Sequence, residues 1–117
     1  VLSLASVPLS LTAVLVPVFY GSGHSVQLEL AQPLERKTLT SLLRKAPMIK
    51  ILDKPAAGGF PTPVTEAAES DNLWVGRIRQ NELDPCRVSL WSVADNLRVG
   101  VARNVLQVAE LLIKDIL

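Results

Sequence analysis

The sequence predicts an α+β domain, with a mixed and mostly antiparallel sheet and helices on one face. Short apolar segments that suit β-strands dominate the chain, and two longer segments carry the spacing of amphipathic helices. The chain has 117 residues, so we expect residues 1–117 to form a single domain. Hydrophobic residues make up 49% and charged residues 20%, a balance that excludes a disordered chain.

Five segments have the composition of β-strands. Residues 11–19 form a β-branched apolar run typical of a strand covered on both faces, and the turn residues 21–23 follow it. Residues 25–30 alternate apolar and polar side chains, as a half-buried strand does. Further strands are expected at residues 48–52, 72–79 and 87–94. The alternation in the fourth strand changes side near Gly76, which predicts a β-bulge there.

Two segments predict helices. Pro33 begins the first, which has its leucines on one face and ends at Ala46-Pro47. The second follows Asp95-Asn96, either of which is expected to cap its early N–H groups. Its buried stripe is expected to consist of Leu97, Val101, Val105, Val108 and Leu112. The predicted order is therefore β-β-α-β-β-β-α, and we expect a partner subunit to cover the other face of the sheet.

Charge and cysteine content exclude several classes of protein. Twelve basic and eleven acidic residues give a net charge of +1 without a basic cluster, so no nucleic acid partner is expected. Residues 1–20 carry no charge, but Pro8 and Pro17 interrupt them, so buried strands are expected there and no membrane span. Cys86 is the single cysteine, which fits a cytoplasmic protein without disulfides. The chain begins at Val1 and is expected to be a fragment.

Few residues are candidates for chemistry. His24 lies in a glycine-rich turn and is either a general base or an exposed loop histidine. Cys86 is either a nucleophile or an ordinary half-buried thiol. Arg77 and Arg79 share a face of their strand, where they either bind an anion or form a solvated, ion-paired surface. No dinucleotide fingerprint, metal-ligand spacing or phosphate loop occurs in the sequence, so any catalysis needs groups outside this chain.

Four stretches carry a resemblance to a known family. In chain order they are VPVFYG at residues 16–21, PTPV at 61–64, VGRIR at 75–79 and WSVADNLR at 91–98. In this order they resemble the aspartate-semialdehyde dehydrogenases, over nearly all of the chain from Leu11 onward. The resemblance implies the carboxy-terminal dimerisation domain of such an enzyme, with a fold like the catalytic domain of glyceraldehyde-3-phosphate dehydrogenase. It also implies a homodimer formed through the sheet.

The same resemblance implies chemistry that lies largely outside this chain. The family reduces aspartyl phosphate to aspartate semialdehyde with NADPH, in amino-acid biosynthesis. Its nucleotide-binding domain and its nucleophilic cysteine precede the region present here. No cofactor is therefore expected in this fragment and NADP is expected in the intact protein, where Asn104 matches an asparagine near the nicotinamide.

Two departures from the family pattern concern catalysis. The family's substrate-binding arginine precedes V-P-V, where this chain has Leu15, and its base histidine follows Y-G, where this chain has Ser22. An isobutyl group cannot bind a carboxylate, and serine is no base near neutral pH. The chain thus resembles the non-catalytic Usg-type relatives. The alternatives are an active NADP-dependent dehydrogenase with His24 as a displaced base, and an unrelated binding domain.

Overall fold

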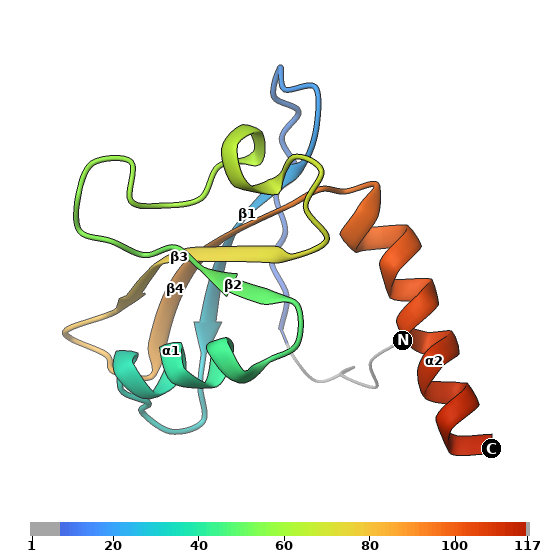
Figure 1. The fold of residues 1–117 in the computed structure, drawn as a ribbon. Helices are drawn as coiled ribbons and strands as arrows, with labels where there is room; N and C mark the ends of the chain where they lie inside the picture. The colour runs from blue at the N-terminus through green and yellow to red at the C-terminus, as the bar shows by residue number, and fades with distance from the viewer. Residues whose placement is uncertain (1–7, 117) are drawn as a thin grey trace.

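The structure is a computed structural model that describes residues 8–116. Its centre is a four-stranded sheet in the order β1-β4-β3-β2 (Figure 1). These strands are β1 (Ser22–Glu29), β2 (Ile49–Ile51), β3 (Leu73–Gln80) and β4 (Arg87–Ala94). β4 runs antiparallel to both β1 and β3, whereas β2 runs parallel to β3. The predicted α+β class with a mixed, mostly antiparallel sheet is confirmed.

Helix α1 (Arg36–Lys45) covers one face of the sheet and packs on β2 and β3. Gln80 at the end of β3 donates from Nε2 to the Leu34 carbonyl oxygen at 2.9 Å, which holds the start of the helix against the sheet. The helix ends at Ala46, which is extended because the residue before a proline disfavours the α conformation. The expected helix and its expected end are confirmed, but the helix begins at Arg36 and not at Pro33.

The core lies on both faces of the sheet. On the α1 face, Val75, Ile78 and Val88 are each only 2% exposed. On the opposite face, a π-helical turn η1 (Pro63–Ala67) packs against β4, and Val93 and Ala67 are fully buried. The sheet is therefore covered near β2 and β3 on one side and near the end of β4 on the other.

The bulge predicted near Gly76 is confirmed and has a clear effect on side-chain direction. The pairing of β3 with β4 shifts between Gly76 and Arg79, and Arg77 has a φ of 53°. The extra residue lets Ile78 enter the core on the α1 face while Arg77 and Arg79 both point to the opposite face. A left-handed arginine is unfavourable, and the Asp53 carboxylate stabilises it by accepting the backbone N–H groups of Arg77 and Ile78.

The predicted strand at residues 11–19 is wrong. This segment forms no strand, and all of its side chains are exposed, with Leu15 at 99% and Phe19 at 97%. An apolar run becomes a strand only when another strand pairs with it, and the described chain supplies none for this segment. Strands expected within residues 1–7 lie outside the described residues. β1 begins at Ser22, so the expected turn at residues 21–23 is also wrong apart from Gly21.

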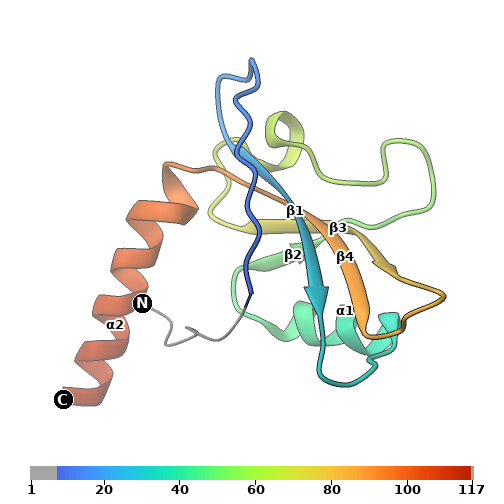
Figure 2. The same cartoon turned by 180° about the vertical axis from the view of Figure 1, so that it is seen from behind.

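The carboxy-terminal helix extends away from the sheet (Figure 2). It comprises a π-helical stretch η2 (Arg98–Arg103) followed by α2 (Asn104–Ile116), and α2 packs mainly on η2. The expected buried stripe is wrong, because all five of its residues are between 49% and 66% exposed. The amphipathic pattern is present, but no described element lies against that face. No helix within the described residues is long and apolar enough to cross a bilayer.

Candidate functional site

Three of the motif segments meet at one corner of the fold, which we call the motif corner and define by Gly21, Pro63, Ala94 and Asn96. Gly21 donates its N–H to Oδ1 of Asn96 at 3.1 Å, which joins residues far apart in the sequence. Gly21 has a φ of 82°, and a Cβ there would lie 3.0 Å from the Ala94 carbonyl oxygen and 3.1 Å from Cβ of Pro63. The corner therefore requires glycine for both its conformation and its close packing.

Asp95 is the buried anchor beside the motif corner. Its Oδ1 accepts the N–H groups of Leu97 at 3.0 Å and Arg98 at 3.2 Å, and its Oδ2 accepts the N–H of Glu69 at 3.0 Å. Of the two residues expected to cap the final helix, Asp95 does so, whereas Asn96 binds Gly21 instead. The Asp95 side chain thus fixes both the start of η2 and the loop before β3.

The pKa of Asp95 reflects this arrangement. Burial of the carboxyl opposes its ionisation, since the residue is only 5% exposed. Hydrogen bonds from the backbone of Leu97, Arg98 and Glu69, together with the Arg98 charge, outweigh burial and hold the pKa below its usual 3.8. Asp95 is therefore a structural carboxylate rather than a proton donor.

The P-T-P-V segment is fixed by its own hydrogen bonds and by β4. Thr62 accepts the N–H of Thr65 on its Oγ1 at 3.0 Å, and Glu66 accepts the N–H of Thr62 on its Oε2 at 2.8 Å. This reciprocal pair, in which Glu66 lies four residues after Thr62, defines the start of η1. Trp91 on β4 donates its indole N–H to the Pro61 carbonyl oxygen at 2.9 Å. These bonds hold η1 against the end of β4 that carries the motif corner.

The residues on which the catalytic hypothesis depends lie on two segments, the exposed segment before the motif corner and strand β1. Leu15 lies on the exposed segment before the motif corner. Ser22 follows Gly21 directly, is half-buried, and pairs with Ala94 at the first position of β1. His24 is exposed and pairs with Ser92, so it belongs to the strand and not to the turn expected from the sequence.

Two further candidates lie elsewhere. Asn104 is the first residue of α2 and its side chain is exposed. Cys86 is a half-buried free thiol in the turn before β4, where its N–H binds Oδ1 of Asp84 at 3.1 Å. Among the described residues, no group of three histidine, cysteine, aspartate or glutamate side chains is placed to hold a metal ion.

A second site lies on the sheet face opposite α1. It is an open cavity of about 470 Å³, which we call the arginine cavity. It is lined by Ser25, Phe60, Arg77, Arg79, Ser89, Leu90 and Trp91. The sequence showed that the two arginines share a face, but it gave no signal that Phe60 joins them, because that residue comes from the long loop after β2.

Comparison with known proteins identifies the family, and the matched region contains the residues of the motif corner. The family model of the semialdehyde dehydrogenase dimerisation domain matches residues 2–99. The chain belongs to the semialdehyde dehydrogenase family. This dimerisation domain is 43% identical to an aspartate-semialdehyde dehydrogenase of Legionella pneumophila, over 96% of the chain and 32% of that protein. It is also 40% identical to a USG-1 protein homolog of Pseudomonas aeruginosa, over 92% of the chain and 31% of that protein.

Solved structures agree with the family. The semialdehyde dehydrogenase dimerisation domain superposes on aspartate semialdehyde dehydrogenase II of Vibrio cholerae with a TM-score of 0.78 and 36% identity, covering 87% of this chain and 30% of that one. A probable aspartate-semialdehyde dehydrogenase of Pseudomonas aeruginosa gives a TM-score of 0.76 at 40% identity, over 86% of this chain and 29% of that one. The chain thus spans about a third of the length of the relatives it matches.

Proposed function

We propose that this chain is the dimerisation domain of a catalytically silent, Usg-type relative of aspartate-semialdehyde dehydrogenase. In this proposal residues 1–117 form one domain of a cytoplasmic homodimer. NADP binds elsewhere in the intact protein, with Asn104 near the nicotinamide. The similarity to a USG-1 protein homolog supports the proposal, but relatives with enzyme names are equally similar, so the argument depends on individual residues.

The main argument for a catalytically silent protein is the distance along β1 between Ser22 and His24. The resemblance places the family's base directly after Gly21, and here that residue is Ser22. His24 lies on the same side of β1 but two residues further along, a displacement of roughly 6.5 Å at the usual rise of a strand. A general base must lie within about 3 Å of the proton that it removes, or act through one water. β1 pairs with β4 without interruption from Ser22 to Glu29, so no local slip brings His24 back.

The loss of the substrate arginine points the same way. Leu15 occupies that position, and an isobutyl side chain offers no hydrogen bond to a carboxylate. A bidentate guanidinium–carboxylate contact is among the stronger polar interactions in proteins, so substrate binding and base catalysis are both weakened. Loss of a general base alone typically reduces the rate by about 10²- to 10⁴-fold.

The test is NADP reduction by the intact protein that carries this domain, with aspartate semialdehyde and phosphate. The control is an active aspartate-semialdehyde dehydrogenase assayed alongside. We expect a rate at least about a hundredfold below that control, from a protein that is folded by circular dichroism. A rate within about a hundredfold of the control would contradict the proposal.

A second candidate is an active dehydrogenase whose substrate lacks the carboxylate and whose base is His24. The exposure of His24, on the side of β1 that Ser22 also faces, favours it. In that case His24→Ala abolishes turnover of the aldehyde substrate, while His24→Gln does not restore it. Unchanged turnover in His24→Ala would exclude His24 as the base.

A further inference from the structure

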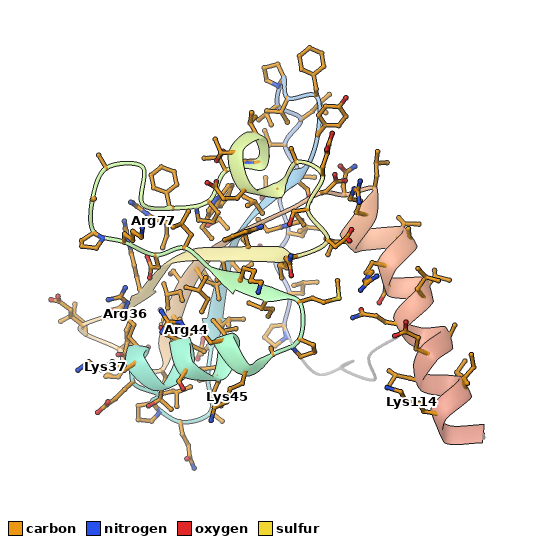
Figure 3. The ribbon with its side chains drawn as sticks, viewed as in Figure 1. Arg36, Lys37, Arg44, Lys45, Arg77 and Lys114 are labelled. Atoms are coloured by element: carbon orange, nitrogen blue, oxygen red, sulfur yellow. The ribbon has the colours of Figure 1, made fainter. Side chains whose placement is uncertain are left out.

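We infer that Arg79 of each copy forms an ion pair with Glu29 of the partner subunit, and that these pairs set how two copies of this domain meet. The inference rests on the proposed homodimer and names the residues that align it. The two copies meet through the sheet face opposite α1, which carries the side chains that border the arginine cavity. Figure 3 shows Arg77 beside the loop after β2, with the labelled cations of α1 on the other side of β3.

The two arginines of this face have no carboxylate partner within the described residues. The ion pairs there involve Arg36, Arg87 and Arg98, but neither Arg77 nor Arg79. A guanidinium group is costly to bury in an interface unless an opposite charge and hydrogen bonds compensate it. A second copy that covers this face must therefore bring a carboxylate to it.

Glu29 is the carboxylate that a second copy can bring. It is the single acidic residue within the four strands β1 to β4. β1 is regular from Ser22 to Glu29, and alternate residues of a strand share a face, so Glu29 lies on the same face as Ser25 of the arginine cavity. The Glu29 carboxylate lies 3.9 Å from Arg87, which is closer to Asp84 at 3.1 Å. Glu29 is exposed and available to a cation of another copy.

The strand order lets Arg79 and Glu29 meet in two equivalent pairs. β1 and β3 lie on either side of β4, so a two-fold axis along β4 places β1 of one copy over β3 of the other. Arg79 is opposite Ser89 on β4 and Glu29 is opposite Arg87, so the two positions differ along the strands by roughly 6.5 Å at the usual rise. The long side chain of arginine bridges this offset. The two-fold axis then forms each ion pair twice.

The bulge of β3 turns Arg79 toward this face. In a regular strand residue 79 would lie on the same face as Val75, which is buried under α1. The left-handed conformation of Arg77 shifts the alternation, so Ile78 enters the core and Arg79 points away from α1. Asp53 holds this conformation by accepting the N–H groups of Arg77 at 3.0 Å and Ile78 at 3.3 Å. The direction of Arg79 is therefore set before the copies meet, which lowers the entropy cost of association.

The aromatic residues beside the arginines also suit a protein interface. The guanidinium carbon of Arg77 lies 5.3 Å from the centre of the Phe60 ring, within the range of a cation–π contact. Trp91 is half-buried and is held by its bond to the Pro61 carbonyl oxygen. Arginine and aromatic residues are enriched in interfaces, whereas glutamate is depleted there. Glu29 departs from this composition, and pairing with Arg79 accounts for the departure.

The test is charge reversal, followed by sedimentation of the 117-residue chain. Arg79→Glu places a carboxylate against the partner's Glu29, and Glu29→Arg places two guanidinium groups against each other. Because the two-fold axis repeats the contact, either variant is expected to raise the Kd of the dimer about a hundredfold, two tenfold steps of roughly 1.4 kcal/mol each. The double variant with both reversals restores opposite charges, and its Kd is expected to return to within about tenfold of the original.

Two reversals on α1 are the matched controls. Arg44→Glu changes an exposed arginine in the last turn of that helix, and Glu35→Arg changes the exposed residue before its first turn. Because α1 lies on the other face of the sheet, neither control is expected to change the Kd of the dimer. Circular dichroism checks that every variant folds.

Four results would overturn the inference. A dimer that neither Arg79→Glu nor Glu29→Arg weakens would have its interface elsewhere, and the proposed homodimer would stand. A double variant as weak as the single variants would show that the two side chains do not meet. Equal weakening by the α1 controls would indicate unspecific charge effects. A monomeric original chain would reject the homodimer together with the inference. None of these results affects the NADP reduction assay, which tests catalysis separately.

Discussion

The Asp95 carboxylate connects three backbone groups that come from two parts of the chain. Sequence alone predicted one of its tasks, because aspartate before an amphipathic segment is a common helix cap. It did not predict the bond to the Glu69 N–H, which depends on how the loop before β3 folds back. The role of Asn96 was also missed, since its partner Gly21 lies at the far end of the sequence. Local capping follows from neighbouring residues, whereas contacts between distant segments require the fold.

Asp95→Asn tests the lowered pKa of that carboxyl. A group with a lowered pKa stabilises the folded state above its unfolded pKa, here near 3.8, and this stability is lost as the pH falls through the folded value. At neutral pH the variant is therefore expected to lose about 1–3 kcal/mol of unfolding free energy, through weaker hydrogen bonds. The gap between the variant and the original chain should narrow as the pH falls below about 3.8.

Urea unfolding at several pH values measures this gap. Glu82→Gln is the control, because Glu82 is exposed in the turn between β3 and β4. Its unfolding free energy should follow that of the original chain at each pH. If the unfolding free energy of Asp95→Asn stays below that of the original chain by the same amount from neutral to acid pH, the charge of the carboxylate does not stabilise the fold.

Among the elements, β3 and β4 were predictable almost to the residue, and the end of α1 was fixed by Pro47. Their apolar and polar side chains alternate because neighbours within the domain cover one face of each. Residues 11–19 and α2 have equally clear apolar patterns, yet both are exposed in the structure. An apolar pattern predicts that a segment is covered, but it does not say what covers it. For this reason the strand predicted at residues 11–19 and the buried stripe predicted for the last helix were both wrong.

Gly23→Ala tests how closely β1 and β4 pack on the cavity side. The new Cβ would lie 2.4 Å from the Trp91 ring, so the ring must move and its bond to the Pro61 carbonyl oxygen is strained. We expect a loss of about 1–3 kcal/mol in unfolding free energy. The measurement is urea unfolding followed by tryptophan fluorescence.

Gly100→Ala is the matched control, because Gly100 lies in helical η2 and an added Cβ there meets no atom within 4 Å. That variant should be neutral or gain up to about 1 kcal/mol, as alanine is the better helix former. Equal stability of the two variants would show that the indole ring does not depend on the space above Gly23.

At the scale of the whole molecule, the exposed apolar surface is unevenly distributed. Large exposed hydrophobic side chains gather in residues 9–20 and in the carboxy-terminal helix, outside the sheet. The sequence predicted that a partner must cover the sheet, because its strands are rich in aliphatic residues. The structure places those aliphatic residues largely under α1 and η1 and leaves a polar, arginine-bearing face. The need for a cover was predictable, but its location was not.

Sedimentation tests the proposed homodimer. The 117-residue chain at micromolar concentration is expected to sediment as a dimer. Residues 21–103, which lack the exposed residues 9–20 and α2, are the comparison. If the domain itself forms the interface, the shorter chain dimerises as well. A monomeric shorter chain beside an associating full chain would place the association in the flanking segments, and a monomer in both cases would reject the homodimer.

The bond between Gly21 and Asn96 has one more consequence, for protein engineering. The first and last strand residues of the sheet are neighbours in space, because Ser22 at the start of β1 pairs with Ala94 at the end of β4. A unit whose two ends are neighbours can be inserted into a surface loop of a host without stretching either protein. Residues 21–96 therefore make a cassette that can be exchanged between hosts while the segments on either side remain with the recipient.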